Sequence, residues 1–452
     1  MNYKLSYYTE FSDPIGKNQN HRMGYAVRSG ASFIINNNIY NNLVNGELES
    51  ISTDIFAQLK DHEFVVPKEQ DEFLYVKRMF YLKRSRENDT LYFVIHPFAG
   101  CQLNCHYCGQ KHQQSMLSDG DIPHIIDRVL DKLRKKPYKV LKIGWFGGEP
   151  IIGIALIKKI TPLLRDIANQ YNCKYVSKIV TNGQLLSKDK FICLIENGVT
   201  KFEITIDGPR NIHDQRRITK TGQGSFDDII DNLQVITSSK IFIDNKKDIA
   251  ISIRTNVDSD NYKQALKIPT ILEEKGILKN LALYYFAPVY SWGNDADKNS
   301  LHLKDFSKLQ VELMAMLMKK GLQYGIMPAN QYEWNCIMHN EDNEVIDANG
   351  DISCCTEVSY VPLYNQSKYY LGNIRSENIE GFNQRPLSLF YKKIFTENSP
   401  CITCKVLPLC GGSCIKQINE NRYKCTPLKY NLKDRLLLLF YSNKDKYELS
   451  KL

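Results

Sequence analysis

Residues 91–108, LYFVIHPFAGCQLNCHYC, are the stretch that decides the fold. The first seven, 91–97, are mostly apolar and rich in aromatic and β-branched side chains, as in a buried strand. Three cysteines follow directly, Cys101, Cys105 and Cys108, with the spacing Cys-x3-Cys-x2-Cys. At this cysteine content, three cysteines at one prescribed spacing arise by chance in about one chain in a hundred. The sequence therefore predicts a strand whose carboxyl end carries a group of thiols.

Apolar segments like this first strand recur along the next two hundred residues and alternate with amphipathic segments. Strands are predicted at 91–97, 140–146, 175–181, 201–207, 249–257 and 280–287. Amphipathic helices are predicted between and after them, at 122–135, 154–169, 187–197, 226–237, 261–275 and 303–321. Six β-α units with short connections indicate an α/β fold with a parallel sheet and helices outside it. Such units form a partial (β/α)6 barrel or an open sheet, with functional groups at the carboxyl ends of the strands.

Four of these predicted strands end in polar or glycine-rich segments. These segments are Gly147-Gly148-Glu149-Pro150, Thr181-Asn182-Gly183, Thr205-Ile206-Asp207-Gly208-Pro209 and Arg254-Thr255-Asn256. Each alone is typical of a turn or a capped strand end. Together, at one mouth of a barrel, they favour a shared ligand.

Thirteen cysteines, an odd number, argue against a disulfide scaffold. The first residues run into polar Thr9-Glu10 with no apolar stretch, so we expect no secretory signal and a cytoplasmic protein. In a reducing compartment clustered thiols bind metal. The three-cysteine loop could be a zinc site with His106 or His112 as fourth ligand, or could hold an iron–sulfur cubane with one open iron. Cys173 and Cys193 stand alone and are expected to be buried as small hydrophobic residues.

The spacing of Cys101, Cys105 and Cys108, with aromatic Tyr107 before the last cysteine, resembles the signature of the radical S-adenosylmethionine (radical SAM) superfamily. Gly147-Gly148-Glu149-Pro150 resembles the GGEP motif of that family, which receives the methionine amino group. The resemblance implies a [4Fe–4S] cluster on the three cysteines. It also implies S-adenosylmethionine contacts from Tyr107, Gly147, Gly148, Glu149, Asn182, Thr205 and Arg254, with Thr205 at the ribose.

A second group of cysteines occupies the last third of the chain. Its core, Cys401-x2-Cys404-x5-Cys410-x3-Cys414, should occur by chance in about 0.0003 of such chains. Cys336, Gly350 and Cys355 precede it, and Cys425 follows it. The whole pattern resembles the SPASM extension of radical SAM enzymes that modify peptides and proteins. Two zinc knuckles are the alternative for this block.

The SPASM resemblance implies two auxiliary [4Fe–4S] clusters, and hence three clusters in all. Cys401, Cys404, Cys410 and Cys425 would hold one of them. Cys336, Cys355 and Cys414 would hold the other, whose fourth ligand is undecided. Cys354 is a sterically awkward candidate beside Cys355, so we expect an open position there.

Three consecutive parts are predicted. Residues 1–90 carry expected strands at 26–28 and 32–35, a helix at 39–44 ended by Asn45-Gly46, and a helix capped at 52–54 that runs to Leu59. This leading part is similar to the winged-helix-like modules that recognise leader peptides. Residues 91–330 would form the partial barrel, and residues 331–452 the Cys-rich SPASM domain with a closing helix from Leu428. Beyond residue 330 the periodicity fades, which suggests little core without metal.

The resemblance implies an enzyme in which S-adenosylmethionine is cleaved reductively and a hydrogen atom is taken from the substrate. We expect an oxidative modification, such as a thioether or carbon–carbon crosslink, in a ribosomally made precursor peptide that docks its leader by strand addition. One alternative is a sulfatase-type maturase that forms formylglycine, although such enzymes begin close to their first cysteine motif. Another is a non-catalytic zinc protein that binds nucleic acid.

The net charge of +9 permits an anionic partner, but the sequence has no run of five basic residues, so nucleic acid is not expected. The longest strongly apolar run, 436–441, is too short for a membrane span. An electron donor such as flavodoxin or ferredoxin is implied by the resemblance. Asp207, Asp214 and Tyr285 lie near the expected mouth as candidate bases, and the sequence does not choose among them.

Overall fold

The computed structural model describes most of the chain and divides it into two units. The described residues are 2–87, 89–291, 294–329, 331–332, 336–365, 367–376, 387–422 and 424–443. Unit 1 comprises Met1–Arg86, His302–Cys336 and Ser388–Leu452, and unit 2 comprises Glu87–Leu301 and Ile337–Leu387. Both units are discontinuous in sequence, whereas the sequence predicted three consecutive parts. The roles assigned to those three parts stay predictions.

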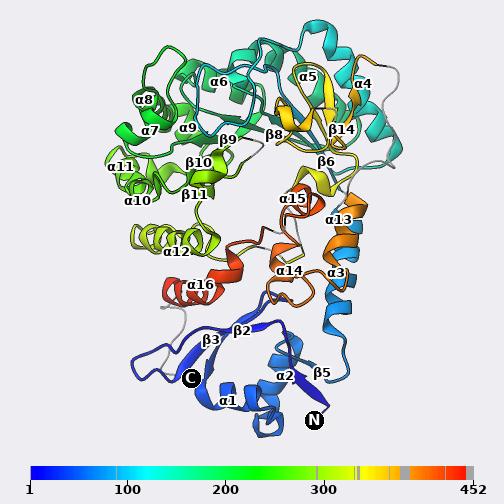
Figure 1. The fold of residues 1–452 in the computed structure, drawn as a ribbon, viewed down its shortest axis with the longest axis vertical. Coiled ribbons are helices and arrows are strands. Elements are labelled where there is room, and N and C mark those ends of the chain that lie inside the picture. The colour runs from blue at the N-terminus through cyan, green and yellow to red at the C-terminus, as the bar shows by residue number, and fades with distance from the viewer. Residues whose placement is uncertain are drawn as a thin grey trace. The chain divides into compact units, whose positions relative to one another are not determined.

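A parallel sheet forms the centre of unit 2 (Figure 1). Its strands are β6 Thr90–Ile95, β7 Val140–Trp145, β8 Lys174–Thr181, β9 Val199–Thr205, β10 Ala250–Val257 and β11 Leu283–Pro288. Each strand pairs in parallel with the next one along the chain. The six predicted strands and the α/β class are therefore confirmed, and this order is that of a partial barrel.

The sheet continues beyond β6 with three strands that the sequence did not predict. They are β12 Glu344–Ile346, β13 Asp351–Ser353 and β14 Tyr370–Asn373. Strand β12 pairs in parallel with β6, and Val345 and Ile346 are fully buried. The expectation of little core beyond residue 330 is therefore wrong. Runs of three or four residues are too short to show a periodicity, yet here they extend an existing sheet.

Helices follow most strands of unit 2. They are α4 Ile122–Lys135, α5 Ile154–Gln170, α6 Lys188–Glu196, α7 Arg210–Arg216, α8 Phe226–Thr237, α9 Lys240–Asp244, α10 Tyr262–Ala265 and α11 Ile268–Glu274. Helix α5 packs on β8, α6 on β9 and α10 on β10. The single helix predicted at 261–275 is wrong, because the chain makes two short helices there. Pro269 lies in the first turn of α11, where its missing N–H leaves no hydrogen bond unmade.

The first 86 residues of unit 1 form two small antiparallel sheets and three helices. Strands β1 Tyr3–Leu5 and β5 Val65–Pro67 pair, as do β2 Thr9–Phe11, β3 His21–Ala26 and β4 Ser32–Asn36 in that order. The helices are α1 Asn37–Asn45, α2 Thr53–Asp61 and α3 Glu72–Glu87. Helix α1 ends at Gly46, whose φ of 78° is left-handed, as predicted. The strand predicted at 26–28 is wrong: β3 ends at Ala26, and a turn follows.

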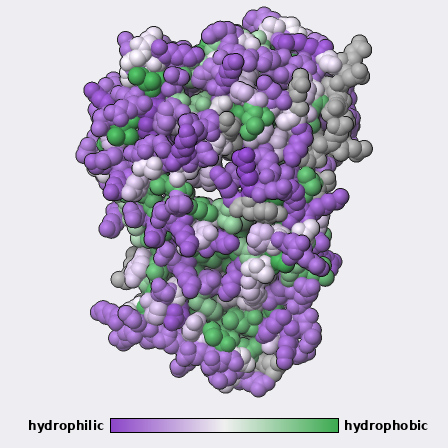
Figure 2. Space-filling model, viewed as in Figure 1, coloured by the Kyte–Doolittle hydropathy of each residue, from purple (hydrophilic) through white to green (hydrophobic). Residues whose placement is uncertain are grey.

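The rest of unit 1 is helical. It contains α12 Leu303–Lys319, α13 Leu387–Ile394, α14 Leu407–Cys410, α15 Ile415–Asn419 and α16 Leu428–Ser442. Helices α12 and α16 lie side by side (Figure 1). The predicted closing helix is confirmed to Ser442, and its end at 444–452 lies outside the described residues. Within the described ranges, no helix is long and apolar enough to cross a membrane. The face drawn in Figure 2 is mostly hydrophilic, with scattered apolar residues.

Candidate functional site

The three-cysteine loop follows β6 directly and is held by a second loop of unit 2. The backbone N–H of Asn104 donates to the carbonyl of Ile218 at 2.8 Å, and that of His106 donates to the carbonyl of Arg216 at 3.2 Å. The N–H of Lys220 donates in turn to the carbonyl of Gln102 at 2.8 Å. The loop is therefore braced along its length by the segment that ends and follows α7.

The three cysteines of this loop are half-buried, and Cys101 lies among hydrogen-bond donors. The backbone N–H of Leu103 and the side-chain amide of Asn182 donate to Cys101 Sγ, at 3.4 and 3.5 Å. Burial raises the pKa of Cys101 to about 11 and that of Cys105 to about 12, and it also raises the pKa of Cys108. Free thiols here keep their protons at neutral pH, so a metal that binds them would have to displace those protons. Three thiols in one loop, with two N–H donors on Cys101 Sγ, fit a cluster bound at three of its irons.

The Gly147-Gly148-Glu149 turn packs directly on the same loop. The N–H groups of Gly148 and Glu149 donate to the carbonyls of Phe98 and Gly100, at 3.2 and 2.8 Å. Gly147 has a φ of 123°, and a Cβ on Gly148 would lie 2.1 Å from the carbonyl oxygen of Gly100. The structure thus explains both glycines by backbone conformation and by close packing of two backbones.

The Glu149 carboxylate is fully buried and joins the ends of two strands. It accepts hydrogen bonds from Thr181 Oγ1 at 2.7 Å and from the backbone N–H groups of Ile151 and Asn182, at 3.0 and 2.8 Å. Burial raises its pKa, and these donors oppose that rise. The carboxylate therefore has a structural role between β7 and β8, and its contact with a methionine ammonium stays a prediction.

Tyr107 forms the centre of a buried hydrogen-bond network at the strand ends. Its hydroxyl donates to Asp207 Oδ2 at 2.5 Å and accepts from Asn256 Nδ2 at 2.9 Å and from the Arg217 guanidinium. Asp207 in turn accepts from the Asn256 backbone N–H at 2.9 Å. The hydroxyl is thus fully engaged by protein groups, and the contact of Tyr107 with S-adenosylmethionine stays a prediction.

The remaining predicted S-adenosylmethionine contacts lie at neighbouring strand ends of unit 2. Asn182 follows β8 and exchanges two side-chain hydrogen bonds with Gln102 of the cysteine loop, at 3.1 and 3.2 Å. Thr205 ends β9 and pairs in the sheet with Arg254 of β10. Arg254 donates from Nε to Asn256 Oδ1 at 2.8 Å. The structure therefore brings these residues to one edge of the sheet, and their contacts with a cofactor stay predictions.

Two of the three candidate bases already have structural partners. Asp207 is fully buried in the Tyr107 network, and Asp214 Oδ1 accepts from the backbone N–H groups of Ser225 and Phe226 at 2.8 and 2.9 Å. The two N–H groups lie at the start of α8, so Asp214 caps that helix. Burial raises the pKa of Tyr285, which makes it a poor base in its neutral form.

Charged residues within the strands form a group that the sequence reasoning missed. Lys178 forms an ion pair with Glu203 at 2.8 Å, and the Lys142 ammonium lies 4.2 Å from the ring centre of Tyr92. Burial, with Lys178 and Lys201 nearby, lowers the pKa of Lys142 to about 8. These half-buried residues alternate with fully buried apolar ones. That period of two along β7 and β8 was a visible signal for a polar sheet face.

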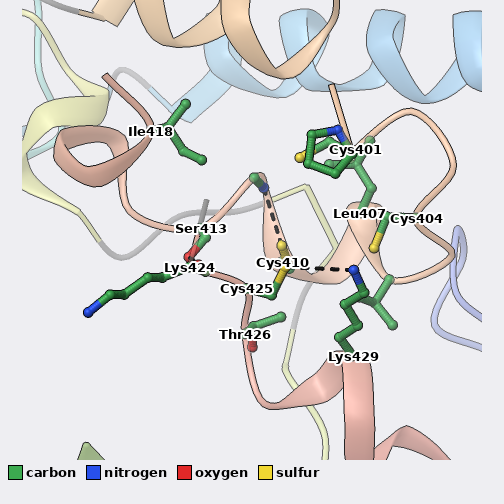
Figure 3. Close-up of a pocket in the computed structure, with 13 residues that line it drawn as sticks. Cys401, Cys404, Leu407, Cys410, Ser413, Ile418, Lys424, Cys425, Thr426 and Lys429 are labelled. Carbon is green, nitrogen blue, oxygen red and sulfur yellow. Dashed lines mark hydrogen bonds between the residues drawn. The ribbon is translucent and has the colours of Figure 1, made fainter. Parts of the chain in front are cut away.

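Four cysteines of unit 1 line one pocket (Figure 3). Cys410 ends α14, while Cys401, Cys404 and Cys425 lie in the loops around it. Burial raises the pKa of Cys410 to about 12, and the Lys429 ammonium lies 3.8 Å from Cys425 Sγ. Four thiols around an apolar-lined cavity fit a fully ligated [4Fe–4S] cluster, and they fit tetrahedral zinc equally well.

The other three predicted cluster ligands are divided between the two units. Cys336 and Cys414 belong to unit 1, where Cys414 directly precedes α15. Cys355 belongs to unit 2, is buried, and follows β13 together with Cys354. The grouping of Cys336, Cys355 and Cys414 on one cluster stays a prediction.

The chain is similar in sequence to a known family and to several known proteins. The Radical SAM superfamily model matches residues 95–261. The chain is 21% identical over 355 residues to a cysteine-type anaerobic sulfatase-maturating enzyme of Clostridium novyi, covering 74% of this chain and 90% of the relative. It is 24% identical over 350 residues to the radical SAM cyclopropyl synthase TigE of Paramaledivibacter caminithermalis, covering 72% and 67%.

Among solved structures, the fold is similar to that of native anSMEcpe with bound AdoMet. The TM-score is 0.57 with 20% identity, over 79% of this chain and 97% of the other. The form with bound AdoMet and Cp18Cys peptide gives a TM-score of 0.56 with 19% identity, over the same shares of the two chains. Residues 95–261 are therefore a radical SAM domain, and the chain is an enzyme.

Proposed function

We propose that the chain modifies a precursor peptide oxidatively, installing a thioether, carbon–carbon or related crosslink. The observation that supports this most is the presence of two clusters of cysteines, one in each unit. The loop of unit 2 offers three cysteines, which suits a cluster with an open iron, and the pocket of unit 1 offers four. A second, fully ligated cluster suits a net oxidation, because that reaction leaves an electron to be accepted.

Family membership implies S-adenosylmethionine and a [4Fe–4S] cluster, which together would supply abstraction of a hydrogen atom from an unactivated carbon. The chain's own part is to hold and orient these groups and to exclude water. Cys101, Cys105 and Cys108 would hold the cluster. Thr205 and Arg254, at two adjacent strand ends, would position the cofactor, and an electron donor such as flavodoxin or ferredoxin would reduce the cluster.

Peptide is the substrate class that the relatives suggest. The Clostridium novyi relative matures a sulfatase, and anSMEcpe has been solved with a bound peptide. The radical SAM match begins at residue 95, so the first 94 residues lie outside it. A precursor peptide with a leader sequence would give this leading part a role.

The leading part has an open strand edge that suits a leader peptide. Strand β4 is the last strand of its sheet, and no backbone hydrogen bond in the described part of the chain covers its outer edge. At the other end of that sheet, the Lys405 ammonium donates to the carbonyl of Thr9 in β2. The carbonyl of Ala31 accepts a hydrogen bond from the N–H of Ala26 in β3. Along an antiparallel pair, residues alternate between facing the partner strand and facing away from it, so the N–H of Ile34 points away from β3. A peptide could add a strand there.

The main test uses anaerobically reconstituted full-length protein, S-adenosylmethionine and a candidate precursor encoded near the gene. We expect mass spectrometry to show loss of two hydrogen atoms per crosslink, and no loss with the Cys101/Cys105/Cys108→Ala variant. Cleavage of S-adenosylmethionine without change in any peptide would contradict a peptide substrate. Stoichiometric zinc without iron would contradict the radical chemistry of these sites.

Leader docking is tested by Ile34→Pro, which removes one outward N–H from the edge of β4. We expect peptide modification to fall at least tenfold at limiting peptide, while S-adenosylmethionine cleavage is kept. Ile34→Val, which retains the N–H, is the matched control. Deleting residues 1–86 is a poorer test, because Phe80 packs against Tyr332 and Phe395 within unit 1.

A sulfatase-type maturase is the second candidate, since the chain aligns with 90% of such an enzyme. Its product, formylglycine, is an aldehyde that a hydrazide reagent labels. A sulfatase-derived cysteine peptide that gains this label would favour the second candidate over a crosslink.

A further inference from the structure

Arg217 is a buried cation beside the three-cysteine loop, and sequence reasoning gave it no role. It follows α7, its side chain is 8% exposed, and its guanidinium donates to the Tyr107 hydroxyl. The same group lies 3.7 Å from Asp207 Oδ2. Its Nε–H is buried and has no hydrogen-bond partner among the described residues. A buried cationic N–H without an acceptor is costly, so this atom indicates a missing acceptor on that side.

The guanidinium of Arg217 contacts the cysteine loop at Tyr107, which lies between Cys105 and Cys108 in sequence. Burial raises the pKa of Cys101, Cys105 and Cys108, and for each of them the Arg217 guanidinium opposes the rise. Burial lowers the pKa of Arg217, and nearby groups raise it. Among those groups Cys105 has the largest effect. One guanidinium thus acts on all three predicted cluster ligands.

The backbone fixes Arg217 relative to the loop. Leu103 and Thr219 form an antiparallel bridge, and the Asn104–Ile218 and His106–Arg216 hydrogen bonds lie on the same two segments. Arg217 therefore sits inside a braced segment, and its position does not depend on a flexible side chain alone.

We propose that Arg217 is a positioning residue that donates its Nε–H toward the cluster ligands and stabilises the cluster when it is reduced. Reduction adds one negative charge to a buried group, and a nearby cation in a low-dielectric setting favours that charge. Asp207 partly neutralises Arg217 and so limits the effect. The inference rests on the radical SAM domain and is independent of the peptide proposal.

The test is a redox titration of the reconstituted full-length enzyme, followed by the electron paramagnetic resonance signal that changes when S-adenosylmethionine is added. Arg217→Gln should keep its iron and shift the midpoint potential of that signal to a more negative value. Asp207→Asn should shift it in the opposite direction, because the cation is then less compensated. Lys220→Gln, an exposed charge on the same segment, should leave the midpoint unchanged.

An unchanged midpoint in iron-replete Arg217→Gln would overturn the proposal, as would shifts of the same sign in both variants. If Arg217→Gln takes up no iron, the variant Arg217→Lys distinguishes an electrostatic role from a packing role. Iron uptake with a midpoint near that of the wild type supports the electrostatic role, since the charge is kept. Loss of iron in Arg217→Lys, with a lowered melting temperature of the metal-free protein, would show that Arg217 acts by packing instead.

Discussion

The hydroxyl of Tyr107 donates a hydrogen bond to Asp207 Oδ2 at 2.5 Å, and this contact joins the cysteine loop to the carboxyl end of β9. Asn256 and Arg217 donate to the same hydroxyl, so three strand-end segments meet at one atom. A buried network of this kind contributes to stability only while every member keeps its partner.

Tyr107→Phe removes that common atom and leaves the Asp207 carboxylate and two donors without it. We expect the free energy of unfolding of the metal-free protein to fall by about 1 to 3 kcal/mol. Denaturant unfolding measures the change. Tyr441→Phe, at a tyrosine that is 53% exposed, is the control and should be neutral. Equal stability of Tyr107→Phe and the control would show that the network contributes little.

Gly148→Ala places a methyl group 2.1 Å from the carbonyl oxygen of Gly100, a backbone atom that cannot rotate away. The cysteine loop must then move. We expect the variant to lose both the iron held by that loop and the ability to cleave S-adenosylmethionine. Iron analysis and a cleavage assay measure both effects. Gly120→Ala, where the nearest atom is a serine hydroxyl at 3.6 Å, should behave like the wild type. Full activity of Gly148→Ala would contradict the close packing of the two backbones.

Cys410→Ala removes the thiol at the end of α14 from the pocket in unit 1. If that pocket holds a [4Fe–4S] cluster, iron per chain should fall by about four relative to the wild type. Cys193→Ala, in helix α6 of unit 2, should keep all the iron. Loss of one zinc per chain in Cys410→Ala, with the iron content unchanged, would instead identify a structural zinc site.

Asp347 gives a prediction for pH dependence. Burial, followed by the nearby Asp351, raises the pKa of this carboxyl to about 7. A folded-state pKa above the unfolded value near 3.9 means that proton binding stabilises the fold. The contribution is fully present below about pH 4 and is lost as the pH rises through about 7.

Asp347→Asn removes the charge and keeps an acceptor for the N–H groups of Asn349 and Asp351. We expect the variant to be more stable than the wild type by about 2 to 4 kcal/mol at pH 8, and the difference to vanish toward pH 4. Unfolding measured at several pH values checks this. A difference independent of pH would mean that the carboxyl is ionised throughout this range.

Much of unit 2 could be predicted from sequence because its strands are long and apolar and its helices amphipathic. In α4, the positions of Ile125, Val129 and Leu133 recur with helical spacing, and all three are buried. Cys101, Cys105 and Cys108 could be found because metal chemistry demands sulfur at fixed spacing in one loop. Local sequence also ended α1 at Gly46, where only glycine adopts the left-handed turn cheaply.

Other features depend on partners that are far apart in sequence. Strand β12 exists because β6 offers it a free edge some 250 residues earlier, and its three residues carry no pattern of their own. Unit 1 joins the chain's beginning to its end, which no local propensity records. The same holds for the role of Arg217.

The sequence by itself determined the strand–helix order and the residue types that bind metal, because both follow from short-range spacing and chemistry. Only the tertiary structure decided which polar groups already have partners. Glu149 and Asp214 proved to hold strand ends and a helix start, while the buried Nε–H of Arg217 has no hydrogen-bond partner among the described residues. Hydrogen bonding and burial depend on distances between residues that are remote along the chain, and these distances are fixed only when the chain folds.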